Sequence, residues 1–478
     1  MDNEVQLARA DLRVKEVFNT LKERSLLLRK EGLWPRKERL EKLREWVHVN
    51  RQRLHEAMYA DFRKNPTEVD AIEVFHVLSE IKHALDNLDV WAASKKVDAP
   101  LPLLGTRSFV QYEPRGVCLI ISPWNYPFSL CIGPFVSALA AGNTVILKPS
   151  ELTPNVSSLI KNMVDEIFDP QVVSVFEGDA DVSTQLLRLP FDHIFFTGSP
   201  TIGKLVMKAA SDNLVSVTLE LGGKSPVIIT ESARIKDAAV RIAFTKFVNN
   251  GQTCVAPDYV LIDKKIQKRF VDELNIQIKK LFAEKNSLIE DSPHYCRIVN
   301  ETHFRRLNEL LQDCLVRGAK LELGGKVSLA DRFIHPTVLS QVPLDSLLME
   351  HEIFGPILPI VAFDNLNQAI KIVNEKPKPL ALYFFTSNNS DEDKILNETT
   401  SGGVCINDCG IQFMHHNLPF GGVNNSGMGK SHGYHGFLTF SHEKAVLKQR
   451  HGFSTAKVFH PPYTKMSKRI MNWFLRFF

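Results

Sequence analysis

Apolar residues recur at helical spacing through the first hundred residues of the chain. Between residues 37 and 62 they follow the roughly 3.6-residue period of an α-helix, at Leu40, Leu43, Trp46, Val47, Leu54 and Met58. A second helical pattern runs from residue 71 to residue 94. The next stretch, 97–116, is interrupted by prolines and glycine and predicts an extended segment or a hairpin.

From Gly116 onward, short β-rich runs alternate with helical patterns. The first series of strand-like runs comprises 116–122, 143–149, 172–178, 193–198 and 215–221. The helical patterns between them include 129–141, 154–168 and 201–210. A second series of strand-like runs comprises 225–230, 258–263, 356–364, 380–386 and 402–408. Such alternation is typical of βαβ units and predicts an α/β fold with two doubly wound, Rossmann-like lobes that meet near 219–260.

Length and composition are those of a folded protein with more than one domain. The 478 residues exceed what one hydrophobic core usually serves, and the apolar and charged fractions are ordinary. The seven cysteines are few and irregularly spaced, which argues against a disulfide framework and favours a reducing compartment such as the cytoplasm. The charged N-terminus lacks the apolar core of a secretory signal, and no apolar run reaches the roughly 18 residues expected of a spanning helix.

Charge is distributed unevenly along the chain. The segment 444–478 holds eight Lys/Arg residues and no acid, whereas the rest holds 50 basic against 54 acidic residues. If the end of the chain is helical, Lys465, Arg469, Asn472 and Arg476 form a polar stripe opposite an apolar cluster that extends about 13 Å. That length is too short to cross a bilayer. We expect 462–478 either to lie on a membrane surface or to pack on the body or on a partner subunit.

The turn after one strand-like run is a candidate phosphate site. In FFTGSPTIGKL (195–205), Gly198 and Gly203 lie where a helix begins, so backbone N–H groups could face an anion. The spacing is close to that of a P-loop, but Leu205 replaces the Ser or Thr that would hold magnesium, which favours a dinucleotide over ATP. A strand–turn–helix connection without a ligand is the alternative.

Polar residues follow two further strand-like runs. Lys148 and Glu151 come where an open α/β sheet binds its ligands, and they could hydrogen-bond ribose hydroxyls or simply be solvated. In SPWNYPF (122–128), prolines bracket Asn125, whose side-chain amide is a candidate oxyanion donor or else part of an Asx turn.

Glu220 and Cys254 are the candidate base and nucleophile. Glu220 ends a strand-like run, where apolar surroundings would raise its pKa toward neutrality, although a lone glutamate before a Gly-Gly turn is more often simply solvated. Cys254 lies in NNGQTC, a sequence of small and amide residues suited to a sharp turn, although judged alone it is more often a buried structural thiol than a nucleophile. Cys405 and Cys409, with the neighbouring histidines, supply only half of a structural zinc site, so we expect no metal.

Taken together and in this order, these stretches resemble the aldehyde dehydrogenase superfamily, from the N-terminal helices to about residue 445. The markers are SPWNYPF, LKPSE, FTGSPTIG, LELGGKSP, GQTCVAPDYV, EIFGP (352–356) and LPFGGVNNSGMG (418–429). The short N-terminus, GQTCVAPDYV and SGMGKSHG are most similar to the class 3 and fatty aldehyde dehydrogenase branch.

The resemblance implies a role for each candidate residue. Cys254 would attack the aldehyde carbon to form a thiohemiacetal, while the Asn125 amide and the Cys254 backbone N–H hold the oxyanion. Hydride transfer to the nicotinamide would leave a thioester, which water activated by Glu220 would hydrolyse. The cofactor would be NAD or NADP, with NAD favoured because Glu151 would repel a 2′-phosphate. The expected cofactor-binding residues are Ser122, Trp124, Lys148, Glu151, Gly198, Ser199, Gly203, Leu221, Glu352 and Phe354.

The resemblance also implies how the chain is divided. It predicts a cofactor-binding domain from 1–98 and 115–220, a catalytic domain from 221–416, a small β oligomerisation arm from 99–114 and 417–445, and a basic tail from 446–478. The resemblance further implies a homodimer that oxidises aliphatic aldehydes of medium or long chain. We expect no nucleic-acid partner, and we expect the protein in the cytoplasm or peripherally on a membrane. A cysteine esterase or thioesterase and a non-catalytic, membrane-associated protein of the same fold are the alternatives.

Overall fold

The computed structural model describes residues 2–100, 103–283, 288–452, 454–455, 457 and 460–477. The chain begins with helices, as the periodicity predicts. They are α1 (Asp2–Leu28), α2 (Leu33–Val49), α3 (Arg51–Phe62), α4 (Pro66–Val69), a π-helical turn (Asp70–Val74) and α5 (Phe75–Trp91). The six apolar residues that define the predicted pattern in 37–62 are all buried.

A first sheet of the described residues has six strands in the order β17-β7-β6-β3-β4-β5. The strands are β3 (Val117–Ile121), β4 (Thr144–Lys148), β5 (Val173–Val175), β6 (His193–Gly198), β7 (Ser216–Leu221) and β17 (Gly427–Met428). Only β17 pairs antiparallel within it. The helices between its strands are α6 (Ser129–Ala141), α7 (Pro154–Ile167), α8 (Ala180–Leu187) and α9 (Pro200–Ser211). Every strand of the first predicted series is therefore confirmed.

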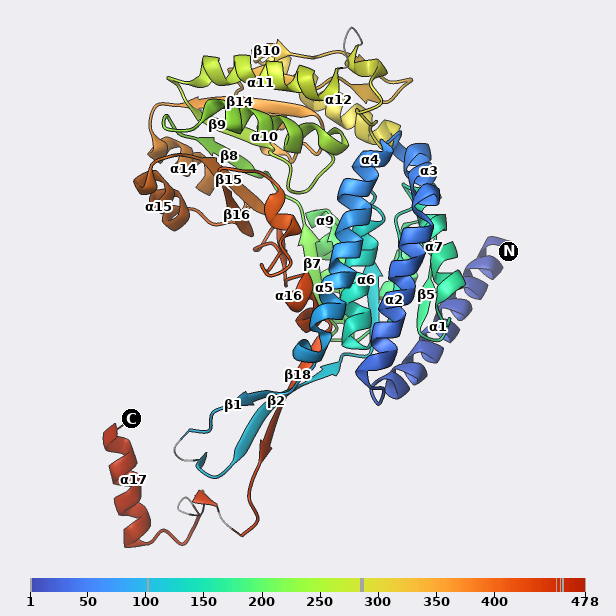
Figure 1. Ribbon diagram of the computed structural model, residues 1–478, viewed down its shortest axis with the longest axis vertical. Helices are drawn as coiled ribbons and strands as arrows, with labels where there is room; N and C mark the ends of the chain where they lie inside the picture. The colour runs from blue at the N-terminus through green and yellow to red at the C-terminus, as the bar shows by residue number, and fades with distance from the viewer. Residues whose placement is uncertain are drawn as a thin grey trace.

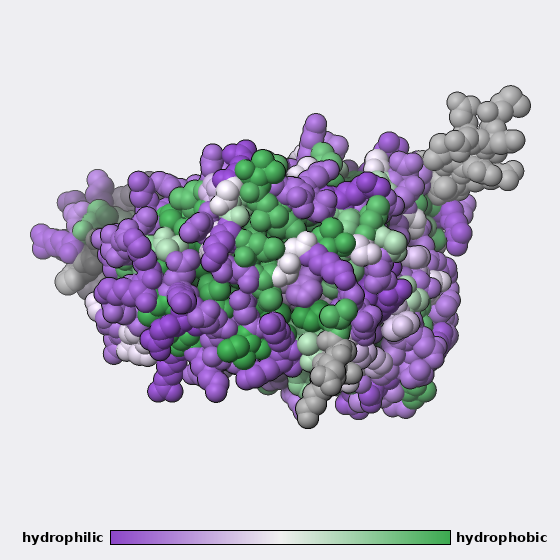
Figure 2. Space-filling view, turned by 90° about the horizontal axis from the view of Figure 1, so that it is seen from above, coloured by the Kyte–Doolittle hydropathy of each residue, from purple (hydrophilic) through white to green (hydrophobic). Residues whose placement is uncertain are grey.

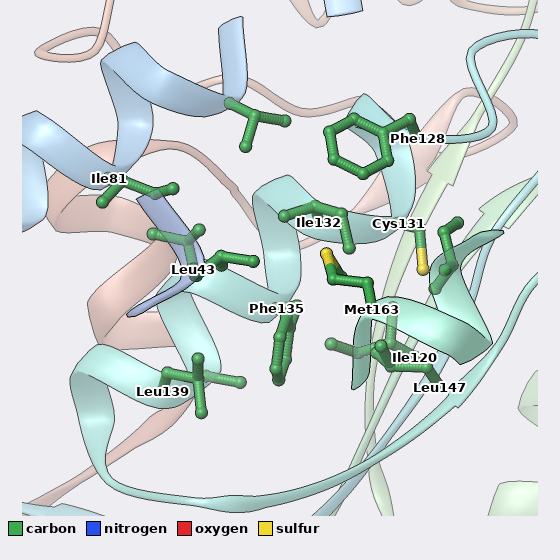
Figure 3. Close-up of a cluster of buried hydrophobic side chains, with 14 of the residues drawn as sticks. Leu43, Ile81, Ile120, Phe128, Cys131, Ile132, Phe135, Leu139, Leu147 and Met163 are labelled. Atoms are coloured by element: carbon green, nitrogen blue, oxygen red, sulfur yellow. The ribbon is translucent and has the colours of Figure 1, made fainter. Parts of the chain in front are cut away.

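Helix α6 forms the centre of the core of this lobe. Most of its residues are apolar, and nearly all of them are buried. Figure 3 shows Ile132, Phe135 and Leu139 of α6 among side chains from α2, α5 and the sheet, such as Leu43, Ile81 and Ile120. A helix that is buried on most sides has apolar residues around most of its circumference, which explains why its sequence shows little amphipathic contrast.

A second sheet has seven strands in the order β10-β13-β14-β9-β8-β15-β16. They are β8 (Pro226–Ile229), β9 (Tyr259–Asp263), β10 (Lys320–Leu323), β13 (Thr337–Ser340), β14 (Ile357–Phe363), β15 (Ala381–Phe385) and β16 (Gly403–Ile406). The helices of this lobe are α10 (Ile235–Phe247), α11 (Gln267–Phe282), α12 (Glu301–Val316), α13 (Leu347–Glu350), α14 (Leu366–Asn374) and α15 (Asn389–Glu398). The two-lobed, doubly wound α/β fold is confirmed; the short strands β10 and β13 were not predicted.

Shorter elements complete this lobe. They are the 3₁₀ turns Val248–Gly251, Ile289–Asp291 and Ile411–Met414 and the two-stranded pair β11 (Val327–Ser328) and β12 (Phe333–Ile334). Seen from the end of the molecule that this lobe forms, hydrophobic residues are scattered among mostly hydrophilic ones (Figure 2). Such a mixture is usual for protein surfaces.

A three-stranded arm projects from the first lobe (Figure 1). It consists of β1 (Lys95–Val97), β2 (Arg107–Pro114) and β18 (Ser441–Lys448), in the order β1-β2-β18 and with antiparallel pairing. The hairpin predicted in 97–116 is thus present, although residues 101–102 lie outside the described part. Helix α16 (Gly433–Thr439) leads into β18, and α17 (Lys465–Phe477) lies beyond the arm, away from both lobes in Figure 1.

Among the described residues, no helix is both long enough and apolar enough to cross a membrane. Helix α17 has 13 residues. Phe478, at the end of the apolar cluster predicted in the tail, lies outside the described residues.

Candidate active site

Four strands of the first sheet carry candidate residues at their carboxyl ends. In the parallel register, Ile121 of β3 pairs with Lys148 of β4, and Gly198 of β6 pairs with Leu221 of β7. Because parallel strands end at one edge of a sheet, the segments that follow them meet there. The predicted residues from 122–125, 148–151, 198–199 and 220–221 therefore lie along the same edge.

The turn before Cys254 has a backbone conformation that few residues adopt. Asn249, Asn250 and Gly251 have φ angles of 51°, 56° and 72°. Asn tolerates this left-handed region better than most residues, and Gly adopts it freely. A Cβ atom on Gly251 would lie 2.3 Å from the carbonyl oxygen of Gly355. The NNG sequence thus forms the sharp turn for which its residues are suited.

Amide side chains hold Asn125 next to this turn. Asn125 Nδ2 donates a hydrogen bond to the carbonyl oxygen of Gln252 at 3.0 Å. Asn249 Nδ2 donates to the carbonyl oxygens of Asn125 at 2.8 Å and of Gln252 at 3.1 Å, and the Asn249 backbone N–H donates to Glu68 at 3.1 Å. A side-chain amide has two N–H donors, so Asn125 keeps one for a ligand in the cavity that it lines.

Cys254 is half-buried and lies where two cavities meet. The first, here called the strand-end cavity, has a volume of about 240 Å³. The candidate residues that line it are Trp124, Asn125, Gly198, Ser199, Glu220, Leu221, Cys254, Glu352 and Phe354. The second, here called the apolar cavity, has a volume of about 440 Å³ and includes Ile72, Phe244, Val248, Ile411 and Met414.

Glu220 is a buried carboxyl with only one hydrogen-bond partner among the described residues. Its side chain is 6% exposed, and its Oε1 accepts a hydrogen bond from Ser431 Oγ at 3.1 Å. Its Oε2 is buried and has no partner in the described part of the chain. Burial raises the pKa of Glu220 to about 8, and the Ser431 hydrogen bond and the Lys430 charge only partly oppose this. A carboxyl with this pKa can both accept and release a proton near neutral pH.

The Cys254 thiol is protonated at neutral pH. Burial, followed by the nearby Glu352 and Glu220 carboxylates, raises its pKa to about 12. The backbone N–H groups of Cys254 and Val255 act in the opposite direction, since they can donate to the sulfur. The reactive form of a cysteine is the thiolate, so this site needs a proton acceptor, and Glu220 lines the same cavity.

Glu352 is a second buried carboxyl with a raised pKa. Burial raises its pKa to about 7, opposed by a hydrogen bond from the Gly223 backbone. A Cβ atom on Gly222 would lie 2.3 Å from Glu352 Oε2, so only glycine allows the carboxyl to approach the backbone here. Phe354, with a φ of 50°, packs edge-on against Trp124 at a centroid distance of 5.4 Å.

Four predicted cofactor residues lie outside the lining of the strand-end cavity. Lys148 is buried and its Nζ lies 2.9 Å from Oε2 of the more exposed Glu151. Ser122 is buried at the end of β3, and its backbone N–H donates to the Lys148 carbonyl oxygen at 3.1 Å. Gly203 is buried in α9, where a Cβ atom would lie 2.8 Å from Leu221. Gly203 therefore allows close packing of α9 on β7, and its contact with a cofactor stays a prediction.

Helix α9 begins at the predicted phosphate turn. Ser199 is its N-cap, and Ser199 Oγ accepts a hydrogen bond from the Ile202 backbone N–H at 3.3 Å. Gly198 and Ser199 both line the strand-end cavity. The start of a helix presents unpaired N–H groups and a partial positive charge, which suits an anion.

Several residues of the site were not predicted. Ser431 bonds Glu220, and His303 and Arg306 line the strand-end cavity. Arg306 also donates to the carbonyl oxygens of Glu352 and its neighbour Ile353 at 3.2 and 2.7 Å, which fixes that turn. His303 and Arg306 belong to no motif that the sequence showed. Ser431 lies in SGMGKSHG (426–433), which indicated the family branch but not the contact with Glu220.

The segment CINDC (405–409), which holds Cys405 and Cys409, lies partly in the second sheet. Cys405 belongs to β16, as predicted, and Cys409 lines the apolar cavity. All seven cysteines, each within the described residues, are free thiols. No group of three or more His, Cys, Asp or Glu side chains in the described part of the chain is arranged to hold a metal ion.

Comparison with known proteins agrees with this geometry. A sequence model of the aldehyde dehydrogenase family matches residues 4–446. The chain is 43% identical over 460 residues to 4,4'-diaponeurosporen-aldehyde dehydrogenase of Staphylococcus aureus, covering 96% of this chain and 97% of that protein. It is 40% identical over 470 residues to mouse aldehyde dehydrogenase family 3 member A2, covering 98% of this chain and 94% of that protein.

A solved structure shows the same likeness in three dimensions. The substrate-bound state of Staphylococcus aureus AldH superimposes with a TM-score of 0.92 at 42% identity, covering 96% of this chain and 99% of that one. The resemblance to the class 3 branch is thereby confirmed together with the fold. The chain is an enzyme of the aldehyde dehydrogenase family.

Proposed function

We propose that this enzyme oxidises aliphatic aldehydes of medium or long chain to carboxylic acids, with NAD or NADP as the oxidant and Cys254 as the nucleophile. The position of Cys254 carries the proposal, because it lies between the strand-end cavity and the apolar cavity. An aldehyde in the apolar cavity and a cofactor in the strand-end cavity would then meet at the sulfur. An esterase would not require the strand-end cavity for a cofactor, and a non-catalytic protein would require neither cavity.

The residues around the sulfur divide the chemistry among them. Glu220 takes the thiol proton, and the sulfur attacks the aldehyde carbon to form a thiohemiacetal. The free N–H of Asn125 and the backbone N–H of Cys254 stabilise the oxyanion, a contribution typically worth ~10²–10³ in rate for one donor. After oxidation to the thioester, Glu220 releases the thiol proton and then takes a proton from the attacking water. The carbon–sulfur bond breaks, its electron pair returns to Cys254, the sulfur regains a proton from Glu220, and the acid leaves.

The residues of the strand-end edge fit a nicotinamide dinucleotide. Such a cofactor supplies the hydride acceptor that the side chains of the protein lack. The N-terminus of α9 suits the pyrophosphate, and Lys148 with Glu151 suits the adenine ribose. Glu352 and Phe354 line the end of the cavity that holds Cys254, where the nicotinamide and its ribose would lie. The negative charge of Glu151 favours NAD over NADP by repelling a 2′-phosphate.

The apolar cavity is the proposed place for the hydrocarbon chain of the aldehyde. Its walls come from α10, through Val240 and Phe244, and from the turn at 410–414, through Ile411 and Met414. Binding a chain there removes apolar surface from water on both partners, at about 0.8 kcal/mol for each buried methylene group. Affinity should therefore increase with chain length until the cavity is filled.

NADH formation tests the proposal. Aldehydes of increasing chain length, each supplied with NAD or with NADP, should give increasing kcat/KM up to a medium or long chain and a preference for NAD. Cys254→Ser should abolish NADH formation, whereas Cys409→Ala, a change in the wall of the apolar cavity, should retain it. Retained NADH formation in Cys254→Ser, or ester hydrolysis without any oxidation of aldehydes, would contradict the proposal.

We also propose that the first lobe binds the cofactor, the second lobe supplies Cys254, and the arm joins two subunits. Strand β18 is an edge of the three-stranded arm, and in the described residues it pairs on one side only, with β2. An open strand edge is a surface that a second copy can cover. Sedimentation of a monomer at assay concentration would contradict the dimer.

Helix α17 is the proposed site of peripheral membrane contact. Lys465, Arg469 and Arg476 lie on one side of it, and the large apolar residues Met466, Trp473 and Leu475 are exposed by 53 to 70%. A short helix of this kind can lie in the headgroup region of a bilayer with its apolar face inward. Such a position would bring the enzyme close to lipophilic aldehydes.

A further inference from the structure

A third, small cavity borders the active site and shares Glu220 and Cys254 with the strand-end cavity. It has a volume of about 30 Å³, and its wall includes Glu220, Cys254, His76, Glu80 and His432. About 10–15 Å³ of such space holds one water molecule, so this cavity has room for about two.

Three buried polar atoms of the wall have no partner in the described part of the chain. They are Glu220 Oε2, His76 Nδ1 and His432 Nδ1. Glu220 and His76 are only 6% and 3% exposed. A buried polar atom without a hydrogen bond costs about 1–3 kcal/mol, and three such atoms around one space that fits water indicate that water occupies it.

On its far side the cavity reaches Glu80, which connects it to the surface. Glu80 Oε1 lies 2.8 Å from His416 Nδ1, and Glu80 Oε2 accepts a hydrogen bond from the Gly433 backbone N–H at 3.1 Å. His416 Nε2 lies 3.1 Å from Ser79 Oγ, and the His416 ring stacks on that of His83 at 5.3 Å. His416 and His83 are both half-buried, so the network extends to solvent.

The reaction proposed above requires such a connection. In each turnover Glu220 first takes the thiol proton, and it must lose this proton before it can take one from the attacking water. The oxygen of the water then bonds to the thioester carbon, its proton goes to Glu220, the carbon–sulfur electron pair returns to Cys254, and the sulfur regains the proton from Glu220. While cofactor and product fill the two larger cavities, the small cavity still borders Glu220.

We propose that water in this small cavity carries the proton from Glu220 to Glu80, and that Glu80 and His416 deliver it to solvent. The inference rests on the proposed function, since it concerns the fate of the proton that Glu220 takes. Glu80 and His416 are proton-transfer residues that act through Glu220 and do not touch the substrate.

Glu220 faces Ser431 and Lys430, while Glu80 faces His76, His416 and His432. Although burial acts to raise it, the hydrogen bond from His416 lowers the pKa of Glu80 to about 2, so Glu80 stays ionised at neutral pH and holds the proton only in passing to His416. Burial lowers the pKa of His76 to about 3 and also lowers that of His432, which disfavours a proton resting on either ring. The hydrogen bond to Glu80 raises the pKa of His416, so His416 is the better acceptor for this proton.

Glu80→Gln tests the proposal, because it keeps the shape of the side chain but removes its ability to accept a proton. We expect kcat to fall at least tenfold and its solvent deuterium isotope effect to increase. The first-turnover burst of NADH and kcat/KM, which depend on the steps before the proton release, should be unchanged. Asp86→Asn, an exposed carboxyl on the same helix, is the matched control and should behave as the unchanged enzyme.

His416→Gln provides a second variant at the half-exposed end of the path, where folding is less at risk. It should show the same fall in kcat with an unchanged burst. An unchanged kcat in both variants, or a burst that falls in parallel with kcat, would overturn the proposal. If the unchanged enzyme forms no NADH from any aldehyde, the proposed function itself fails, which the variants alone would not indicate.

Discussion

At the residue scale, burial shifts the acid–base behaviour of the groups around Cys254. Glu220 has a pKa of about 8 and the thiol one of about 12, so both are mainly protonated at neutral pH. Desolvation is the largest cause in each case, because the charged form of either group loses its hydration in the closed site. The ionised fraction of Glu220, the form that accepts a proton, therefore grows as pH rises toward 8.

The direction of the Glu220 pKa shift predicts how activity depends on pH. Below pH 8, kcat should rise roughly tenfold for each pH unit, because the ionised base increases by that factor, and it should level off above 8. Glu220→Gln should lose this dependence together with most of the activity. The measurement is the kcat profile of both enzymes with one aldehyde and saturating NAD.

Glu352→Gln serves as the comparison, since Glu352 is the other buried carboxyl that lines the cavity. In the proposed role it positions the cofactor, so its variant should raise the KM for NAD and keep the rise in kcat below pH 8. If kcat no longer rises with pH in Glu352→Gln but still rises in Glu220→Gln, then Glu352 is the base and Glu220 positions the cofactor.

The sequence predicts the residues that strand ends and turns bring together, and it misses those that join from remote segments. Asn125, Glu220 and Cys254 all line one cavity, as their positions after strands and in the NNG turn indicated. Ser431, the hydrogen-bond partner of Glu220, is 211 residues away from it along the chain. No local pattern encodes that contact, because it depends on how the segment before α16 packs on β7.

At the element scale, most buried parallel strands were predictable because each is a continuous apolar run between turns. The buried strand β13 was missed, because only two of its four residues are apolar. Strands β3, β4 and β8 are buried at every residue. The edge strand β10 is more exposed and mixes Lys and Glu with Leu, so its pattern does not differ from that of a loop. The sequence therefore does not predict how many strands each sheet contains, because edge strands depend on packing that no local pattern shows.

The turn before Cys254 gives a stability prediction. Gly251→Ala should lower the melting temperature and the activity together, because the residue has a φ of 72° and its new Cβ would lie 2.3 Å from the Gly355 carbonyl oxygen. Gly318→Ala is the matched control, with a φ of 98° and nothing within 4 Å of the added atom. The control should lose only the backbone term, about 1 kcal/mol. Equal effects of the two changes on melting temperature would contradict the close approach.

The walls of the apolar cavity give a specificity prediction. Phe244→Asp places a charge on the α10 wall of this cavity. About two methylene groups of a long aldehyde would then lose their apolar contact, which costs about 0.8 kcal/mol of binding free energy for each group. The kcat/KM for a long-chain aldehyde should fall roughly tenfold or more, while that for a two- or three-carbon aldehyde should change little. Phe244→Leu keeps an apolar wall and should preserve the preference. A parallel loss for all chain lengths would show that the hydrocarbon lies elsewhere.

At the scale of the whole molecule, the arm and α17 extend the protein away from the lobes that hold the site (Figure 1). The exposed apolar residues of α17 lie on a helix whose charged residues are all basic. The two positions expected for the tail, a membrane surface or a protein surface, differ in their dependence on lipid charge.

Vesicle flotation distinguishes these two positions. The full chain should float with vesicles that contain anionic phospholipid, and deletion of 462–478 should abolish this. Replacing Lys465, Arg469 and Arg476 by Gln should weaken binding roughly 100-fold, at about 1 kcal/mol per charge.

The matched control replaces three exposed lysines of α11, Lys268, Lys279 and Lys280, by Gln. It removes the same charge from the second lobe and should leave flotation unchanged. Equal binding of the full chain and the deletion variant would place α17 on protein and not on lipid.

The covalent state of Cys254 tests the central claim most directly. Glu220→Gln, mixed with a long-chain aldehyde and NAD, should form NADH slowly, because the thiol must lose its proton to water instead of to Glu220. NADH formation should stop at about one per site, because the thioester that forms is not hydrolysed. Mass spectrometry of the digested protein should find the acyl group on the peptide that contains Cys254. An acyl group on another residue, or a variant that turns over without any adduct, would contradict the account.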